Sequence, residues 1–214
     1  CAKAVAMEWG LPLLKMDPSS LYNKYVGESE KNFNRAMKTA EKMSPVILWI
    51  DEIEKAFSSD AGSADGGLST RIFGTFLSWL QDRKGDVFIV ATANDVNALP
   101  PEFMRKGRFD EIFFVDLPDA ETRKAIFSIH LQKRGKDPAL FDLGELSVSA
   151  EGFSGSEIEQ VIVSGLYSAF SEKKELTTAI LQNEIAATRP LSETMSERIL
   201  RLREWARGRT VSAH

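Results

Sequence analysis

Two periodicities alternate along the first half of this 214-residue chain. Short apolar runs, rich in β-branched and aromatic residues, are separated by longer stretches whose apolar positions recur at helical spacing. The short runs predict β-strands at residues 11–16, 46–50, 87–92 and 112–115. The longer stretches between the first three strands predict crossover helices at residues 28–43 and 68–81. Strands that alternate with helices in this way indicate an α/β fold with a parallel sheet.

The pattern changes after Pro118, where helical periodicity continues without a convincing strand. A second, helical domain is therefore predicted. Ser154 or Ser156 can cap the start of its helix at residues 155–174. In the first domain, the small polar residues at 58–67 predict a mobile surface loop. The helices of the second domain are expected at residues 120–133, 155–174, 177–188 and 192–207.

Composition removes several classes of function. The chain has one cysteine, Cys1, and histidines only at His130 and His214, which disfavours a disulfide framework and a structural zinc site. The formal net charge of -4 gives no overall basic field for nucleic acid. No apolar run approaches the roughly 18 to 20 residues of a membrane span. We expect a protein of a reducing compartment, the cytoplasm, with no membrane partner.

Two carboxylates follow the most apolar of the predicted strands. Asp51 and Glu52 come directly after residues 46–50, so a parallel sheet would present both at its carboxyl edge, where open α/β folds bind ligands. There Asp51 could hold Mg²⁺ through its water shell, and Glu52 could polarise a water for attack on a γ-phosphate. The alternative is that both residues cap the start of the next helix.

Further polar residues follow the next predicted strand. Asn94 could orient the attacking water from a neighbouring strand tip, although asparagine also commonly ends strands as a turn residue. Arg105 and Arg108 lie beside a glycine and could contact a phosphate in a transition state. A solvated basic turn is the alternative for the two arginines.

Taken together, these segments resemble the AAA group of the AAA+ ATPases, which includes FtsH, the proteasomal ATPases, katanin and valosin-containing protein. The resemblance extends from Cys1 to about Arg189. Through LWIDEIEKAF and PPEFMRKGRFDEIFFVDLP the chain is also similar to the hypothetical-reading-frame AAA proteins of chloroplasts and cyanobacteria. The motifs that occur in family order are KYVGESE, VILWIDE, ATAND, RKGRFD, LPD and GFSGSEIEQ.

The resemblance implies ATP and Mg²⁺ as cofactors and assigns roles in their chemistry. Asp51 and Glu52 correspond to the Walker B pair, and Asn94 to the first sensor. Arg105 and Arg108 correspond to arginine fingers that reach the nucleotide of an adjacent subunit, which implies a homo-oligomeric ring, usually a hexamer.

In the family, the segment around Gly155 faces the adenine and ribose. Gly155 and Ser156 stand where relatives often have Gly-Ala, and no second-sensor arginine occurs at that point.

An aromatic-aliphatic-glycine triplet, Tyr25-Val26-Gly27, corresponds to the pore loop that grips polypeptide in threading members of the family. An exposed aromatic side chain at a loop tip offers a flat surface to any extended chain. The alternative is that Tyr25 packs into the core. The resemblance also matches the small-residue segment at 58–67 to a second pore loop.

One family element has no counterpart in this sequence. A phosphate-cradling loop requires GxxxxGK followed by Ser or Thr, and no such string occurs. The chain opens on CAKAVAMEWG, which has the composition of a helix interior, so the resemblance implies that the phosphate loop and the central first strand precede Cys1. We therefore expect a partial α/β large subdomain at residues 1–118, a helical lid at 119–190 and a C-terminal helix or tail at 191–214.

The leading interpretation is an ATP-hydrolysing ring that remodels or threads protein substrates. A non-threading regulatory switch or assembly factor is the first alternative, and a non-hydrolysing interaction module is the second. A nucleic-acid motor is disfavoured, because Glu193, Glu197 and Glu204 are interleaved with the basic residues near the C-terminus.

Overall fold

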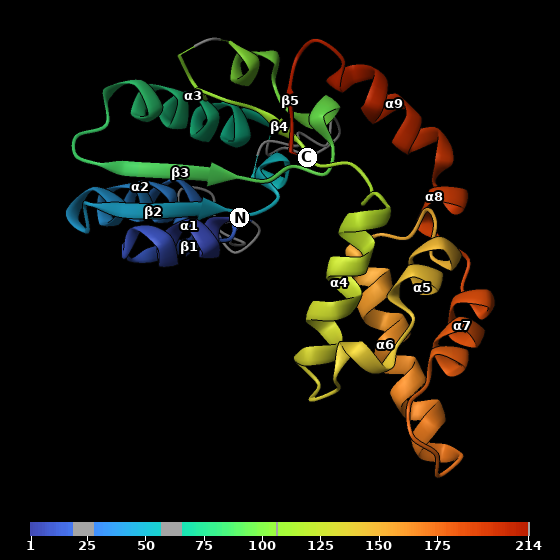
Figure 1. The fold of residues 1–214 in the computed structure, drawn as a ribbon. Coiled ribbons are helices and arrows are strands. Elements are labelled where there is room, and N and C mark those ends of the chain that lie inside the picture. The colour runs from blue at the N-terminus through green and yellow to red at the C-terminus, as the bar shows by residue number, and fades with distance from the viewer. Residues whose placement is uncertain (19–27, 57–65, 106, 214) are drawn as a thin grey trace. The chain divides into compact units, whose positions relative to one another are not determined.

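The computed structural model describes residues 1–18, 28–56, 66–105 and 107–213 (Figure 1). The chain divides into two compact units, Cys1–Asp110 and Glu111–His214, each with its own hydrophobic core. The first unit contains a parallel sheet with helices, and the second is mainly helical, so the predicted fold class is confirmed. No helix among the described residues is long and apolar enough to cross a bilayer.

The sheet of the first unit is parallel and follows chain order. Its strands are β1 (Leu13–Met16), β2 (Val46–Ile50) and β3 (Val87–Ala91), with β2 in the middle. Ile50 pairs with Met16 on one side and with Ala91 on the other, so all three strands end at the same level. The residues that follow these strands are therefore neighbours at one edge.

Helices pack on both faces of this sheet. Helices α2 (Glu28–Lys42) and α3 (Gly66–Asp82) contact each other and share one core with alternate residues of β2. The shorter α1 (Ala2–Trp9) contacts β1 and β2 and is not part of that core. With apolar neighbours on both sides, β2 is an almost continuous apolar run, as expected for a central parallel strand.

Short 3-10 helices follow two of the strands. Phe103 of η4 is buried, and its ring lies 5.2 Å from that of Phe73 and 5.9 Å from that of Phe76, centroid to centroid. This aromatic packing anchors the segment that leads to Arg105 and Arg108. The 3-10 helices with described bounds in this unit are η2 (Ile53–Ala56), η3 (Val96–Ala98) and η4 (Pro101–Met104).

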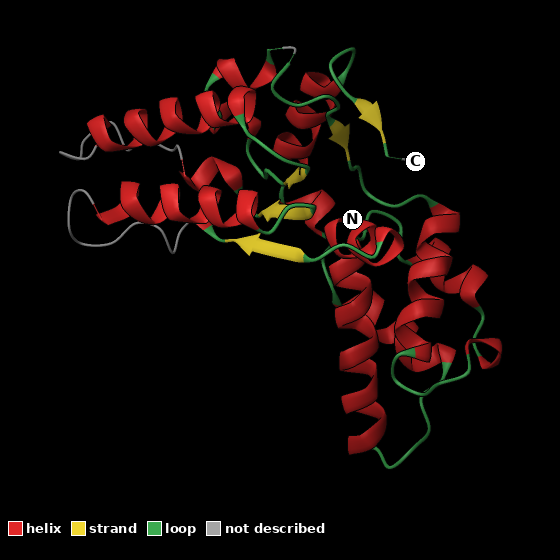
Figure 2. Cartoon of the chain, turned by 90° about the vertical axis from the view of Figure 1, so that its left-hand side faces the viewer, coloured by secondary structure: helices red, strands yellow, loops and turns green. Residues whose placement is uncertain are grey.

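Helices make up most of the second unit (Figure 2), and its core comes from four of them and the turns between them. Polar side chains cap the start of each helix by accepting a backbone N–H: Asp119 for α4, Asp142 for α5, Ser154 for α6 and Thr177 for α7. The helices are α4 (Ala120–Gln132), α5 (Leu143–Ser149), α6 (Gly155–Ser171) and α7 (Thr178–Ala187), with η5 (Pro138–Leu140) before α5.

The ends of the second unit differ from the prediction. The strand expected at residues 112–115 is the short β4 (Phe113–Phe114), which pairs in parallel with β5 (Val211–Ser212) in a separate two-stranded sheet and not with β3. Strand β5 was not expected, because its two residues carry no detectable periodicity. The two compact units divide between Asp110 and Glu111, and the predicted domain boundary between residues 118 and 119 stays a prediction.

Two helical details also differ. The helix expected at residues 192–207 is divided at Met195 into α8 (Leu191–Thr194) and α9 (Ser196–Ala206). Met195 leaves helical geometry with φ −124° and ψ 27°. Helix α5 was not predicted, because its seven residues span only two turns of apolar pattern. Helix α1 agrees with the interpretation of the first ten residues as helical.

Candidate active site

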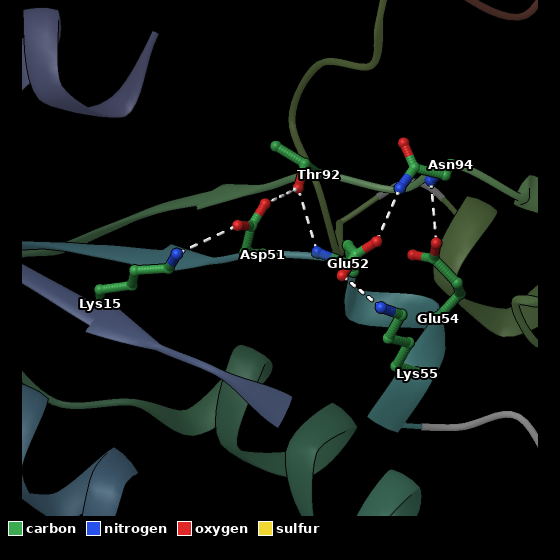
Figure 3. A network of polar contacts seen from close by, with 7 residues as sticks. All are labelled: Lys15, Asp51, Glu52, Glu54, Lys55, Thr92 and Asn94. Atoms are coloured by element: carbon green, nitrogen blue, oxygen red, sulfur yellow. Dashed lines mark hydrogen bonds and ion pairs between the residues drawn. The ribbon is translucent and has the colours of Figure 1, made fainter. Parts of the chain in front are cut away.

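The carboxyl edge of the sheet gathers polar side chains from neighbouring strands (Figure 3). Asp51 and Glu52 directly follow β2, and Thr92 directly follows β3. The main chains are joined at this level, because Thr92 N–H donates to the Ile50 carbonyl at 3.0 Å and Ile53 N–H donates to the Thr92 carbonyl at 2.9 Å. The ladder therefore continues past the strand ends and fixes the acidic pair beside Thr92.

The hydroxyl of Thr92 links the two acidic residues. Its Oγ1 lies 2.7 Å from Asp51 Oδ1 and 3.1 Å from the Glu52 backbone N. A hydroxyl has one proton, and the Glu52 N–H can only donate, so Thr92 donates to Asp51 and accepts from Glu52. One side chain thus fixes both the Asp51 carboxylate and the Glu52 main chain.

Asp51 is held as a carboxylate. The hydrogen bond from Thr92 lowers the pKa of Asp51 most, and Lys15, whose Nζ lies 3.2 Å from Oδ2, lowers it further. Partial burial opposes these effects without outweighing them. Lys15 itself lies over the Trp49 ring, 4.4 Å from its centroid, which keeps the ammonium near the strand end.

The main chain of Glu52 is strained. Its φ of 51° lies in the left-handed region, which a non-glycine residue occupies only when its surroundings compensate. Its side chain has two partners: Asn94 Nδ2 donates to Oε1 at 3.0 Å, and Lys55 Nζ donates to Oε2. The strained backbone directs this carboxylate toward Asn94, at the tip of the neighbouring strand.

A buried acid supports the position of Asn94. Glu54 is only 7% exposed, and its Oε1 accepts the Asn94 backbone N–H at 3.0 Å. Its Oε2 is buried and has no hydrogen-bond partner among the described atoms. A buried carboxylate with one unsatisfied oxygen is uncommon, and it marks this contact as more than a surface turn.

The structure therefore brings together three residues that the sequence singled out, Asp51, Glu52 and Asn94. Sequence reasoning missed the residues that hold them, although two signals were present. The threonine is the last residue of the strand expected at residues 87–92, and the lysine follows Glu52 by three residues, one turn of a 3-10 helix. The missed residues are Lys15, Glu54, Lys55 and Thr92.

The two arginines occupy the segment after η4. Arg105 is exposed, whereas Arg108 is half-buried and its Nη1 is a buried atom without a hydrogen-bond partner among the described residues. Their assignment to a neighbouring nucleotide stays a prediction.

Gly155 and Ser156 belong to the second unit, at the start of α6. Ser154 provides the cap there, as part of a capping box with Glu157. The nucleotide-facing role of Gly155 and Ser156 stays a prediction. The proposed pore residues Tyr25, Val26 and Gly27, and residues 58–65 of the small-residue segment, lie outside the described residues.

The donor set fits magnesium better than a transition metal. Across the described ranges, no three His, Cys, Asp or Glu side chains gather in a metal-binding group. Mg²⁺ commonly takes only one or two protein carboxylates and completes its shell with water and phosphate oxygens. Asp51, charged and at the sheet edge, fits that requirement, and Glu52 remains close by.

A parallel sheet with polar side chains gathered at its carboxyl edge is the arrangement in which open α/β proteins bind ligands. Residues 1–117 match the model of the ATPase family associated with various cellular activities (AAA). The chain belongs to this AAA family, which confirms the resemblance of its motifs.

Individual relatives agree with this assignment. The chain is 46% identical over 96% of its length to the uncharacterized AAA domain-containing protein ycf46 of Guillardia theta, and 48% identical over 96% to that of Pyropia yezoensis. It is 34% identical over 83% of its length to a proteasome-activating nucleotidase of Methanococcus vannielii. The matched regions cover 41%, 42% and 44% of these three proteins, so the chain spans less than half of each relative.

Proposed function

We propose that the protein hydrolyses ATP with Mg²⁺, and that this chain supplies the acid-base side of the site. The observation that carries the proposal is the linked group of Asp51, Glu52 and Asn94, which Thr92 and the sheet ladder fix at one edge. Membership of an ATPase family supports it. The sequence contains no phosphate-cradling string, so the proposal concerns only the acid-base side of the site.

Each of the three residues has a distinct role in this proposal. Asp51 holds Mg²⁺ through its water shell, which its charged state and exposed position allow. Bound Mg²⁺ would neutralise charge that develops on the phosphate oxygens. Glu52 accepts a hydrogen bond from the attacking water and draws its proton, and Asn94 orients that water without competing for the proton.

Glu52→Gln tests the role of the acid in the full-length protein. The amide keeps the size of the side chain but accepts a proton poorly, so ATP turnover should fall by about 100-fold or more while ATP binding persists. The matched control is Glu8→Gln in α1, an exposed glutamate away from the site, which should leave turnover unchanged. If Glu52→Gln retained most of the wild-type turnover, the proposed role would be wrong.

Assembly into a hexameric ring is part of the same proposal. The exposed position of Arg105 suits a finger that contacts the nucleotide of a neighbouring subunit, and Arg108 would act beside it. Variants at either arginine should lose turnover only in assembled rings. Mixing them with wild-type subunits tests this. If the finger acts across the interface, a variant subunit that lacks it should lower the activity of the adjacent wild-type site.

The substrate of the proposed machine is a polypeptide, gripped by Tyr25, Val26 and Gly27. The relative named a proteasome-activating nucleotidase is consistent with work on proteins. Tyr25→Ala should keep basal ATP hydrolysis and abolish substrate remodelling. Unchanged remodelling would favour a regulatory switch or assembly factor, and a full-length protein that binds no ATP would favour a non-hydrolysing interaction module.

A further inference from the structure

The proposed general base has a second partner that the ATPase chemistry does not require. Glu52 Oε1 accepts from Asn94, and Oε2 forms an ion pair with the ammonium of Lys55 (Figure 3). Both oxygens are therefore engaged. The contact with Asn94 connects the acid to the proposed water-orienting amide, whereas the contact with Lys55 draws the other oxygen toward η2.

Local geometry places Lys55 there. After the left-handed turn at Glu52, the chain enters η2, and Lys55 N–H donates to the Glu52 carbonyl at 2.9 Å. In a 3-10 helix, side chains three residues apart lie one above the other, so the lysine side chain returns over Glu52. The hydrogen bond to Glu52 raises the pKa of Lys55, so the ammonium stays charged at any physiological pH.

The exposure of the pair indicates that it opens readily. The side chains of Lys55 and Glu52 are 52% and 38% exposed, so water surrounds the contact and salt can screen it. An ion pair of this kind adds little to the stability of the fold. It can nevertheless decide the orientation of a single carboxylate, which must turn its oxygen to a water before it can accept a proton.

We propose that Lys55 is a positioning residue that holds Glu52 in a resting orientation and thereby limits basal ATP turnover. The inference rests on the proposed function, because it requires Glu52 to be the base. Lys55 touches neither nucleotide nor water in this scheme and acts only through Glu52. Turnover then requires the Lys55 to Glu52 ion pair to open.

The test compares Lys55→Met with Lys55→Arg in the full-length protein at saturating ATP. Methionine keeps an unbranched apolar stem without the charge, and basal kcat should rise about twofold to fivefold, the range expected for loss of an exposed ion pair. The KM for ATP should stay unchanged. Arginine keeps the positive charge and should retain the low wild-type rate. Lys42→Met, at an exposed lysine of α2, is the matched control and should also behave as wild type.

Ionic strength gives a readout that a purely structural role would not alter. Added salt screens the ion pair, so it should raise the basal kcat of the wild-type protein toward that of Lys55→Met, which itself should respond less. A kcat for Lys55→Met at or below the wild-type value would overturn the inference. An equal rise in Lys55→Arg would also overturn it.

Glu52→Gln, measured alongside, separates the two proposals. If that variant retains turnover, Glu52 is not the base and the proposed function fails with the inference. If it loses turnover while Lys55→Met keeps the wild-type rate, only the role of Lys55 is wrong.

Discussion

Two groups of polar side chains, the helix caps of the second unit and the residues at the sheet edge of the first, serve different purposes. The caps bind backbone groups close in sequence: Asp119, Asp142, Ser154 and Thr177 each accept an N–H at the start of a helix. At the carboxyl edge of the sheet, side chains bind side chains about forty residues away, as Thr92 binds Asp51. The first arrangement stabilises the starts of helices, and the second brings the residues of the candidate site together.

The difference extends to strain. The four capping residues use ordinary backbone geometry, although Lys173 after α6 has a positive φ of 55°. At the sheet edge, Glu52 lies in the left-handed region, and one oxygen of buried Glu54 has no hydrogen-bond partner among the described residues. The second unit does bury a charge, but Arg123 donates from Nε to the Ser147 carbonyl and from Nη1 to the Pro118 carbonyl, both at 2.8 Å. Among the described residues, the buried side-chain atoms without a hydrogen-bond partner thus belong to Glu54 and Arg108, both in the first unit, and none belongs to the second unit.

The largest expected effect on stability lies in the helical core. Leu181 of α7 is fully buried in the core of the second unit, so Leu181→Ala should lower the free energy of unfolding by about 2 to 5 kcal/mol through lost burial and a residual cavity. Urea denaturation followed by circular dichroism measures this. Leu140→Ala, at a leucine that is 77% exposed, should change it by less than about 0.5 kcal/mol. Equal effects at the two positions would contradict the described core.

Thr92→Val tests the polar residues at the sheet edge. Valine matches the shape of threonine but can neither donate to Asp51 nor accept from Glu52. ATP turnover of the full-length protein should fall by roughly tenfold, while the free energy of unfolding should change by no more than about 1 kcal/mol. Thr92→Ser keeps the hydroxyl and should retain most activity. A variant that lost stability but not turnover would place Thr92 with the structural caps.

A smaller effect is expected at a cap. Ser154→Ala removes the acceptor for the Glu157 N–H and breaks the capping box of α6, so the free energy of unfolding should fall by about 1 kcal/mol. Ser171→Ala, at the exposed last residue of the same helix, is the control and should have little effect. Thermal denaturation of both variants makes the comparison. Any loss of turnover in Ser154→Ala beyond its loss of folded protein would show that this cap also serves the site.

The smallest expected effect concerns pH. Because the pKa of Asp51 is lower in the folded protein than its ordinary value of 3.8, the unfolded chain takes up this proton first as pH falls. The resulting stabilisation is present above about pH 4 and is lost as pH falls through the folded pKa. Solvent screening keeps it small, because the side chain is 36% exposed. Carboxyl NMR titration should show the low pKa in the wild type and a higher one in Thr92→Val.

Much of the fold could be predicted, because buried positions produce a regular pattern of apolar residues in the sequence. Strand β2 was found at its observed bounds, since a strand covered on both faces is apolar throughout. The short elements could not be found in this way. Strands β4 and β5 have two residues each, and their pairing depends on contact between segments nearly a hundred residues apart, about which local pattern carries no information.

Sequence alone could predict Asp51 and Asn94 of the candidate site, but not the residues that connect them. Asp51 and Asn94 stand out because each follows an apolar strand. Their connection through Thr92, and the support that Glu54 gives Asn94, depend on strand register and on a left-handed turn at a glutamate. A sequence shows that a threonine is present, but only the register shows that its hydroxyl lies between two acids.

The pairing of β4 with β5 has a mechanical consequence. Val211 N–H donates to the Ile112 carbonyl at 2.8 Å, and Ala213 N–H donates to the Phe114 carbonyl at 3.2 Å. Because the strands are parallel, tension applied at the entry and exit of the second unit would pull them in opposite directions along their length. Both hydrogen bonds would then be loaded in shear at the same time. The two strands would therefore have to slide apart before the force reached the helices of this unit.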